Sequence, residues 1–161
     1  MPEPTSAPTL PKVGAPAPDF CLPSTEGRDI CLSDYRDKQA VVLYFYPRDD
    51  TPGCTAEACS FRDLRRTFQD RGVEILGVST DSVTSHQKFR EKYGLNFPLL
   101  ADRDHQVAER YGVWQTKKFM GRESMGVVRT TFVIDEEGIM KAVFPNVKVE
   151  GHADEVLAAL G

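Results

Sequence analysis

The sequence predicts one α/β domain in which a mixed β-sheet is flanked by helices. Two continuous apolar runs, AVVLYFY at 40–46 and VEILGVS at 73–79, are typical of buried central strands. The segment 52–71 between them has the apolar periodicity of a helix. Two later runs, 127–135 and 139–144, are separated by a DEEG turn and predict a closing hairpin. Strands that alternate with helices before a final hairpin indicate a mixed sheet with helices on both faces.

The N-terminal part of the chain predicts a tail followed by a β-hairpin. Six of the eleven prolines lie in the first twenty residues, so we expect residues 1–12 to form an extended, poorly ordered tail. The folded domain would then cover 13–161. Within it, DFCLPSTEGRDICLSDY predicts a hairpin, because apolar and polar residues alternate on both sides of a Glu26-Gly27 turn.

The remaining elements follow from shorter patterns of apolar residues and of glycine. Internal repeats are not found, and no second domain is indicated. The expected elements are a helix at 82–94 ended by Gly94, a strand at 96–102, a helix at 103–112, a polar loop at 115–126 and a C-terminal helix at 153–161.

Composition excludes several classes of function. A net charge of −4 with dispersed Lys and Arg argues against nucleic acid or an anionic membrane as partner. No apolar run approaches the ~20 residues of a membrane span, and the N-terminus lacks the pattern of a secretory signal. We therefore expect a cytoplasmic protein. Four cysteines are too few for a disulfide scaffold, which leaves buried hydrophobes, metal ligands or redox catalysts.

The stretch YPRDDTPGCTAEACS places a thiol at the start of a helix. Thr51 is a suitable N-cap and Pro52 a suitable first helical residue, so Cys54 falls in the first turn. Unpaired N–H groups and the positive end of the helix dipole favour a thiolate there, and the thiolate is the nucleophilic form of cysteine. Gly53 leaves room for a small substrate, and Pro47 ends the preceding strand and helps to fix the loop.

Cys59 lies on the same predicted helix but on a different face. It shares the polar face with Arg62, Asp63 and Arg66, whereas Cys54 begins the apolar stripe. In an ideal helix the two cysteines are separated by ~140°, with Cα atoms ~8–9 Å apart. A disulfide needs Cα atoms within about 7 Å. Cys54 and Cys59 can therefore join only after the first turns of the helix unwind.

These residues resemble the active-site signature of a known family. Pro47-x-x-x-Thr51-x-x-Cys54 resembles the signature of the peroxiredoxins, and Cys59, five residues later, resembles the bacterioferritin-comigratory-protein or PrxQ subgroup. RTTFVID places Arg129 on a late strand, where the family has its active-site arginine. The resemblance extends from about residue 12 to the C-terminus, and the signature follows a buried strand and precedes a helix, as it does in the family.

The resemblance implies a thioredoxin-like fold and a thiol peroxidase. Cys54 would be the peroxidatic cysteine, which attacks hydrogen peroxide or an organic hydroperoxide and becomes a sulfenic acid. Cys59 would be the resolving cysteine, which forms an intramolecular disulfide with Cys54. Thioredoxin or a similar dithiol protein would reduce this disulfide. The family subgroup implies a monomer, and the reaction needs no metal or other cofactor.

The resemblance also implies roles for the neighbours of the thiol. Thr51 would donate a hydrogen bond to the bound peroxide, and Pro47 would shield the site. Arg129 would favour the thiolate and stabilise charge in the transition state. Glu57, one turn after Cys54, would orient Arg129. The residues also have simpler interpretations, because an acidic residue in a first helical turn is common for dipole reasons alone.

Two other kinds of function remain open. A thioredoxin-like disulfide oxidoreductase usually carries Cys-x-x-Cys at the start of this helix, and such a pair is absent from the sequence. A non-enzymatic peroxide sensor or chaperone on the same fold would oxidise once per thiol. Consumption of hydroperoxide with a dithiol reductant distinguishes the peroxidase from both.

Cys21 and Cys31 form a separate problem. If the hairpin register centres on Glu26, they lie opposite each other, and a disulfide is conceivable. We expect two packed thiols instead, because directly opposed positions often suit disulfide geometry poorly and the expected compartment is reducing. Cys-x-x-x-x-Cys is poor zinc spacing. The histidines are scattered along the sequence and none neighbours a cysteine: His86, His105 and His152.

Overall fold

The computed structural model describes residues 9–160, except for the side chain of Phe119. Residues 1–8 of the predicted tail therefore lie outside the described residues. Leu10 packs against the core. The carbonyl of Thr9 occupies the space that a side chain on Gly112 would need, and Gly112 has a positive φ of +71°. The division of the chain at residue 12 stays a prediction.

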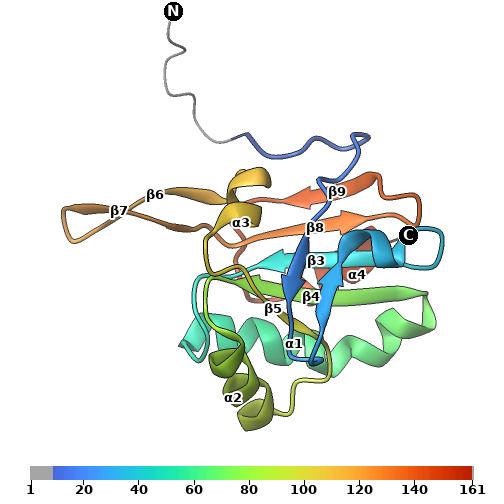
Figure 1. Ribbon diagram of the computed structural model, residues 1–161, viewed down its shortest axis with the longest axis horizontal. Helices are drawn as coiled ribbons and strands as arrows, with labels where there is room; N and C mark the ends of the chain where they lie inside the picture. Colours follow the sequence, from blue (N-terminus) through green and yellow to red (C-terminus); the bar gives the residue numbers. More distant parts are fainter. Residues whose placement is uncertain (1–8, 161) are drawn as a thin grey trace, which may run out of the picture.

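A five-stranded mixed sheet forms the centre of the molecule, in the order β5-β4-β3-β8-β9 (Figure 1). The strands β3, β4 and β5 are parallel, and β8 and β9 continue the sheet in antiparallel pairing. The sheet confirms the predicted mixed α/β class. Its strands are β3 (Ala40–Phe45), β4 (Val73–Ser79), β5 (Leu99–Ala101), β8 (Thr130–Ile134) and β9 (Met140–Phe144).

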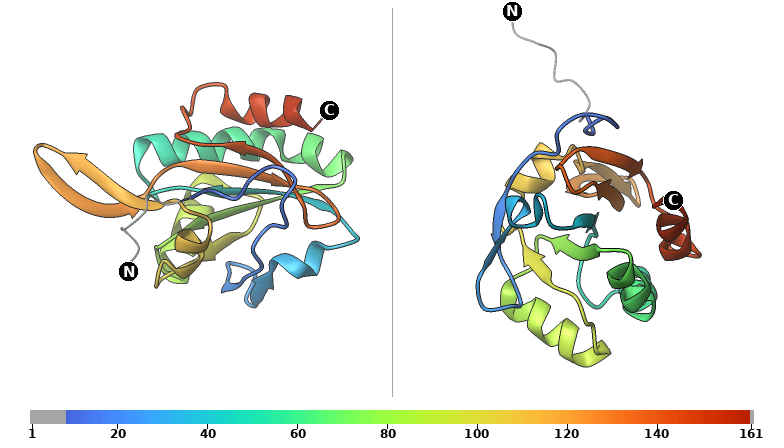
Figure 2. Two further views of the ribbon diagram at one scale, coloured as in Figure 1. Left: turned by 90° about the horizontal axis from the view of Figure 1, so that it is seen from above. Right: turned by 90° about the vertical axis from the view of Figure 1, so that its right-hand side faces the viewer.

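Both faces of the sheet are covered (Figure 2). Helices α1 (Pro52–Asp70) and α4 (His152–Ala159) pack on one face. The opposite face carries the hairpin of β1 (Cys21–Pro23) and β2 (Asp29–Cys31), the 3₁₀ helix η1 (Leu32–Tyr35) and α3 (Gln106–Arg110). Helix α2 (Val83–Tyr93) lies beside β5 at the edge. Two apolar cores result, one on each face.

Strand β3 shows why an unbroken apolar run suits the centre of this sheet. Val41, Leu43 and Phe45 face the core beneath the hairpin and α3. Val42 and Tyr44 face the core beneath α1 and α4. Successive side chains of a strand point to opposite faces, so a strand covered on both sides must be apolar at every position.

The predicted N-terminal hairpin is confirmed, but the prediction for its cysteines is wrong. The register pairs Leu22 with Ile30 and Cys21 with Cys31, and Cys21 and Cys31 form a disulfide. The N–H of Leu32 donates to the carbonyl of Phe20 at 3.0 Å, so that neighbouring pair is hydrogen-bonded. Cys21 and Cys31 therefore form a non-hydrogen-bonded pair, where facing residues approach most closely. This proximity brings the two sulfurs together.

A second correction concerns the predicted polar loop at 115–126. The structure has a hairpin there, formed by β6 (Trp114–Phe119) and β7 (Arg122–Val127), which projects from one end of the sheet (Figures 1 and 2). Met120 and Gly121 form its two-residue turn, with φ values of +53° and +76°. Two successive positive φ angles define the turn type that matches strand twist. Polar residues form this hairpin because most of it is exposed.

The other predicted elements are present with shifted ends. The strand expected at 96–102 is confined to β5, and the helix expected at 103–112 is confined to α3. Strand β8 begins at Thr130, so Arg129 precedes the strand on which the sequence placed it. Among the described residues, no helix combines the length and apolar character needed to cross a membrane.

Candidate active site

Cys54 lies in the first turn of α1, as the sequence predicts. Thr51 is the N-cap residue, and its carbonyl accepts the N–H of Thr55 at 2.8 Å. The side chain of Cys54 is a free thiol and is 2% exposed. The orphan N–H groups of the helix start and its dipole favour negative charge at this sulfur.

Arg129, immediately before β8, contacts the sulfur of Cys54. Phe45, the last residue of β3, pairs with Thr130 in antiparallel pairing. Arg129 therefore lies just beyond this pair, at the end of β3 that leads to α1. Its Nη2 donates to Cys54 Sγ at 3.2 Å. A side chain on Gly53 would place its Cβ 3.2 Å from the same nitrogen, so glycine leaves the guanidinium its space. Glycine at this position of α1 therefore avoids a tight contact with Arg129 directly before the thiol.

Glu57 fixes the orientation of this arginine. Nη1 of Arg129 donates to Glu57 Oε1 at 2.6 Å. Glu57 is 1% exposed, and its Oε2 has no hydrogen-bond partner among the described residues. Burial raises the pKa of Glu57 to about 7, although Arg129 acts to lower it. Burial lowers the pKa of Arg129, but the charges of Glu57 and Cys54 outweigh it and leave that pKa raised. The two nitrogens of one guanidinium thus join the carboxylate to the thiol.

The wild type is expected to lose stability as pH rises from about 4.5 to about 7, and the Glu57→Gln variant is expected not to show this loss. In that window the unfolded chain releases the proton of Glu57 while the folded chain keeps it, because folding raises this pKa from 4.5 to about 7. The unfolding free energy of the wild type therefore falls by about 3 kcal/mol relative to the variant as pH rises. Urea unfolding at pH 5 and pH 8 measures this difference. Glu123→Gln, at an exposed ion pair, is the control and should show no such change. A wild-type minus Glu57→Gln difference that stays constant with pH contradicts the prediction.

Thr51 and Pro47 lie in the loop that leads into α1. Thr51 Oγ1 donates to the carbonyl of Arg48 at 3.0 Å instead of accepting a hydrogen bond from the helix N-terminus. Thr51 is thus the N-cap residue by backbone position, whereas a capping bond from its side chain is not formed. Pro47 is half-buried and lies two residues after the end of β3. The roles of both residues toward a bound peroxide stay predictions.

Helix α2 holds this loop through two aspartates that the sequence analysis did not single out. Asp49 accepts from Tyr46 Oη at 2.6 Å and from Ser85 Oγ at 2.7 Å, and His86 Nδ1 lies 2.7 Å from it. His86 is fully buried, and its Nε2 donates to the carbonyl of Leu100 at 2.8 Å. These bonds fix the path of the chain five residues before Cys54.

Asp50 forms a second attachment to the same helix. Its carboxylate accepts from Lys92 Nζ at 2.8 Å and from Tyr93 Oη at 2.6 Å. The hydrogen bond between the two side chains raises the pKa of Lys92 and lowers the pKa of Asp50. Both partners are substantially exposed, so the pair orients the loop more than it stabilises the fold.

Two half-buried carboxylates and a buried histidine near this loop are of the residue types that bind metal ions. Ligand atoms of Asp49, Asp81 and His86 lie within 4.8 Å of one another. Asp81 Oδ2 already accepts from Ser79 Oγ and from the N–H of Asp49, at 2.8 and 2.7 Å. His86 Nδ1 and Asp49 Oδ2 are hydrogen-bonded to each other. These hydrogen bonds account for the cluster as an anchor of the loop.

Cys59 lies one turn and a half further along α1 and is half-buried. The helix is continuous from Pro52 to Asp70, and both Cys54 and Cys59 are free thiols. The spacing of an intact helix keeps their Cα atoms ~8–9 Å apart. A disulfide between them therefore requires a second conformation of this helix.

Lys117, on the hairpin that the sequence analysis missed, is a further cation near the thiol. Its Nζ donates to the carbonyl of Val127 at 2.6 Å, which directs the side chain back toward the base of the hairpin. Burial lowers the pKa of Lys117, the charge of Arg129 lowers it further, and Cys54 raises it. Its neighbour Lys118 points outward, is 76% exposed and pairs with Glu123. Alternation of apolar and polar residues along a strand would have indicated from the sequence which of the two lysines points inward. Both belong to a run of polar residues, so this signal is absent.

Lys117→Met is expected to lower the rate constant for oxidation of Cys54 several-fold, and Lys118→Met to leave it unchanged. A partly buried cation within reach of the thiolate stabilises negative charge more than a fully exposed one, because water screens the exposed charge. Stopped-flow oxidation of the reduced protein by hydrogen peroxide at low ionic strength measures both. Equal rate constants for the two variants contradict this placement of Lys117.

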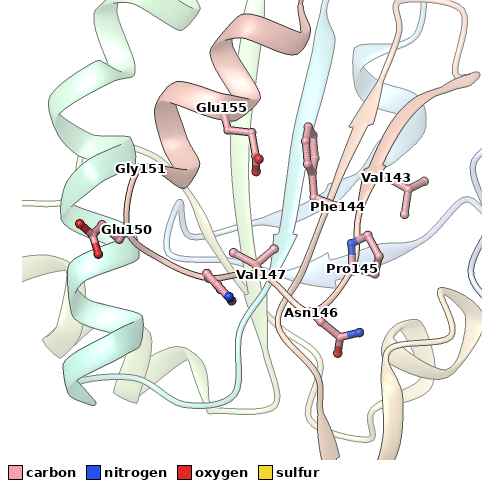
Figure 3. A pocket seen from close by; sticks show the side chains of 9 residues that line it. Val143, Phe144, Pro145, Asn146, Val147, Glu150, Gly151 and Glu155 are labelled. Atoms are coloured by element: carbon pink, nitrogen blue, oxygen red, sulfur yellow. The ribbon is translucent and has the colours of Figure 1, made fainter.

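A pocket of about 430 Å³ opens elsewhere, between the end of β9 and the start of α4 (Figure 3). Val147 lines the pocket, and its N–H donates to the carbonyl of Arg129 at 2.9 Å. The pocket therefore adjoins the backbone of Arg129. None of the predicted site residues lines it. The lining residues are Val143, Phe144, Pro145, Asn146, Val147, Lys148, Glu150, Gly151 and Glu155.

The sequence and the fold of this chain match known proteins. Residues 13–143 match the AhpC/TSA family. The chain is 52% identical to a putative peroxiredoxin Bcp of Coxiella burnetii, over 92% of this chain and 98% of that protein. It is 48% identical to the peroxiredoxin Bcp of Bacillus subtilis, over 92% of this chain and 94% of that protein. A crystal structure of a PrxQ mutant from Xylella fastidiosa superposes with a TM-score of 0.89 at 35% identity, covering 94% of this chain and 96% of that one.

The chain therefore belongs to the AhpC/TSA family, and within it to the peroxiredoxins of the Bcp and PrxQ type. Such proteins have the thioredoxin fold, so the fold class predicted from the sequence is confirmed in full.

Proposed function

We propose that the protein reduces hydrogen peroxide and organic hydroperoxides with Cys54 as the peroxidatic residue. The contact of Arg129 Nη2 with Cys54 Sγ at 3.2 Å carries this proposal, because it places a fixed cation on a buried thiol at a helix start. The reaction of a thiolate with a peroxide needs little beyond an activated sulfur and donors for the oxygen that leaves.

In the first step the Cys54 thiolate attacks one oxygen of the O–O bond. An S–O bond forms, the O–O bond breaks, and the other oxygen leaves with a proton as water or an alcohol. Arg129, held by Glu57, stabilises the sulfur anion and the charge that develops on the oxygens. The hydroxyl of Thr51 contacts the peroxide, and Pro47 limits the access of water.

In the second step Cys59 resolves the sulfenic acid. Its thiolate attacks the sulfur of Cys54, water leaves, and an intramolecular disulfide forms. The first turns of α1 unwind in this step, since an intact helix keeps the cysteines apart. A thiol reductant of the thioredoxin class then returns both residues to thiols. We propose this cycle for a monomer in the cytoplasm, where such reductants maintain thiols.

One equivalent of hydrogen peroxide, added to the fully reduced protein and followed by mass-spectrometric mapping of the cysteines, tests this cycle. A Cys54–Cys59 disulfide is the expected product. If Cys54 stops at a sulfenic or sulfinic acid while Cys59 stays reduced, Cys59 is not the resolving residue and an external thiol must complete the cycle. If Cys54 does not react, the assignment of the peroxidatic residue is wrong.

A further inference from the structure

The disulfide of the N-terminal hairpin lies on the solvent side of that hairpin. Leu22 and Ile30 point into the core and are 8% and 0% exposed. Cys21 and Cys31 are their neighbours in sequence and point to the opposite face, where Cys21 is exposed and Cys31 is half-buried. A sulfur of this bond is therefore accessible to a thiol from solution while the protein is folded.

The hairpin is also held by contacts other than the disulfide. At its tip, the N–H of Thr25 donates to the carbonyl of Leu99 at 3.0 Å, and Arg90 pairs with Glu26 at 2.8 Å. Its inner face is part of the core on that side of the sheet. Reduction would thus leave the two thiols opposite each other in the same register, ready to rejoin.

A groove beside Cys21 offers space for a reacting thiol. It has a volume of about 280 Å³ and is bounded by β1 and the segment 101–110. Its lining includes Arg103 and Arg110 together with Asp104, so it presents charges of both signs. A small polar thiol finds both donors and acceptors there.

We propose that Cys21 and Cys31 are a second thiol/disulfide couple, which exchanges with low-molecular-weight or protein thiols independently of Cys54. The two couples are separated by the sheet: the hairpin covers one face, whereas α1, with Cys54 and Cys59, packs on the other. Direct exchange between them within one chain is excluded by this arrangement.

The exchange proceeds in two balanced steps. A thiolate of the reductant attacks the exposed sulfur of Cys21, the bond between Cys21 and Cys31 breaks, and Cys31 leaves as a thiolate that takes a proton from water. A second thiol of the reductant then attacks the mixed disulfide, which frees Cys21 and leaves the reductant as a disulfide. A small disulfide such as oxidised glutathione reverses both steps.

The full-length Cys54→Ser/Cys59→Ser variant isolates the hairpin couple from the proposed peroxidase cycle. Dithiothreitol is added under native conditions, samples are quenched with N-ethylmaleimide, and mass spectrometry counts the alkylated thiols. We expect Cys21 and Cys31 to be alkylated together, at a rate that rises about tenfold for tenfold more reductant, with an unchanged circular dichroism spectrum. Oxidised glutathione should restore the disulfide.

Two results would overturn the proposal. In one, thiols appear only in denaturant, or at a rate independent of the reductant, which means that unfolding limits access. In the other, Cys21 and Cys31 remain thiols in the presence of oxidised glutathione. The Cys21→Ser/Cys31→Ser variant tests independence: its rate of peroxide reduction should equal that of the wild type, and a loss of more than about tenfold would contradict separate couples.

Discussion

Replacing Cys54 with serine is expected to lower the rate of hydroperoxide reduction by more than about a thousandfold, because a hydroxyl at this position cannot supply the nucleophile. Replacing Cys59 with serine should have a different effect. The reduced Cys59→Ser variant should consume one equivalent of peroxide as fast as the wild type, but it should not turn over with a dithiol protein that recognises the Cys54–Cys59 disulfide. Rapid-mixing kinetics with one equivalent of peroxide, followed by steady-state assays with thioredoxin and its reductase, separate the two steps.

The control for both serine variants is Cys21→Ser/Cys31→Ser, which removes the two sulfurs on the opposite side of the sheet. This control should retain both the reaction with one equivalent of peroxide and the turnover with thioredoxin. A Cys59→Ser variant that turns over normally with thioredoxin would show that the sulfenic acid of Cys54 is reduced directly. A Cys54→Ser variant that still consumes peroxide would move the peroxidatic role to another cysteine.

The strands and helices that form the two cores could be predicted from the sequence because their patterns are local. The runs at 40–46 and 73–79 are apolar at every position, as a strand buried on both faces requires. The hairpin of β6 and β7 could not be predicted in this way. Its residues are mostly exposed and polar, so they carry no apolar alternation, and its Met120-Gly121 turn differs from the Asn-Gly or Asp-Gly pairs that signal such turns.

The site was predictable where its residues belong to one motif or match the family, and not where unrelated positions meet only in the folded chain. Cys54 and Thr51 lie within a few residues of each other, and the resemblance to peroxiredoxins pointed to Arg129 and Glu57. The attachment of Asp49 to His86 joins residues 37 positions apart, and no local pattern relates them. The sequence did predict that Cys21 and Cys31 face each other. The choice between thiols and a disulfide depended on whether this cross-strand pair is hydrogen-bonded or not, which the sequence does not show.

Arg129→Met is expected to lower the rate constant for oxidation of Cys54 by about a hundred- to a thousandfold at pH 7, the usual cost of removing one donor that stabilises transition-state charge. Two effects contribute, since Arg129 favours the thiolate and also stabilises the charge that develops on the peroxide oxygens. Repeating the stopped-flow measurement at about pH 9.5, where an ordinary cysteine is mostly ionised, separates them. The part of the loss that persists at high pH belongs to the transition state.

Two further variants distinguish the position of the guanidinium from its charge. Arg129→Lys keeps the charge but cannot contact Glu57 and Cys54 with two nitrogens at once, so its rate constant should lie closer to that of Arg129→Met than to the wild type. Gly53→Ala keeps Arg129 itself but places a methyl group 3.2 Å from Nη2, which must shift by a few tenths of an ångström. We expect a loss of about tenfold from this small displacement, because catalytic groups must be held in close alignment. If the rate constants of Arg129→Lys and Gly53→Ala both equal that of the wild type, the arginine acts only through its positive charge. The contact of its two nitrogens with Glu57 and Cys54 is then not what activates the thiol.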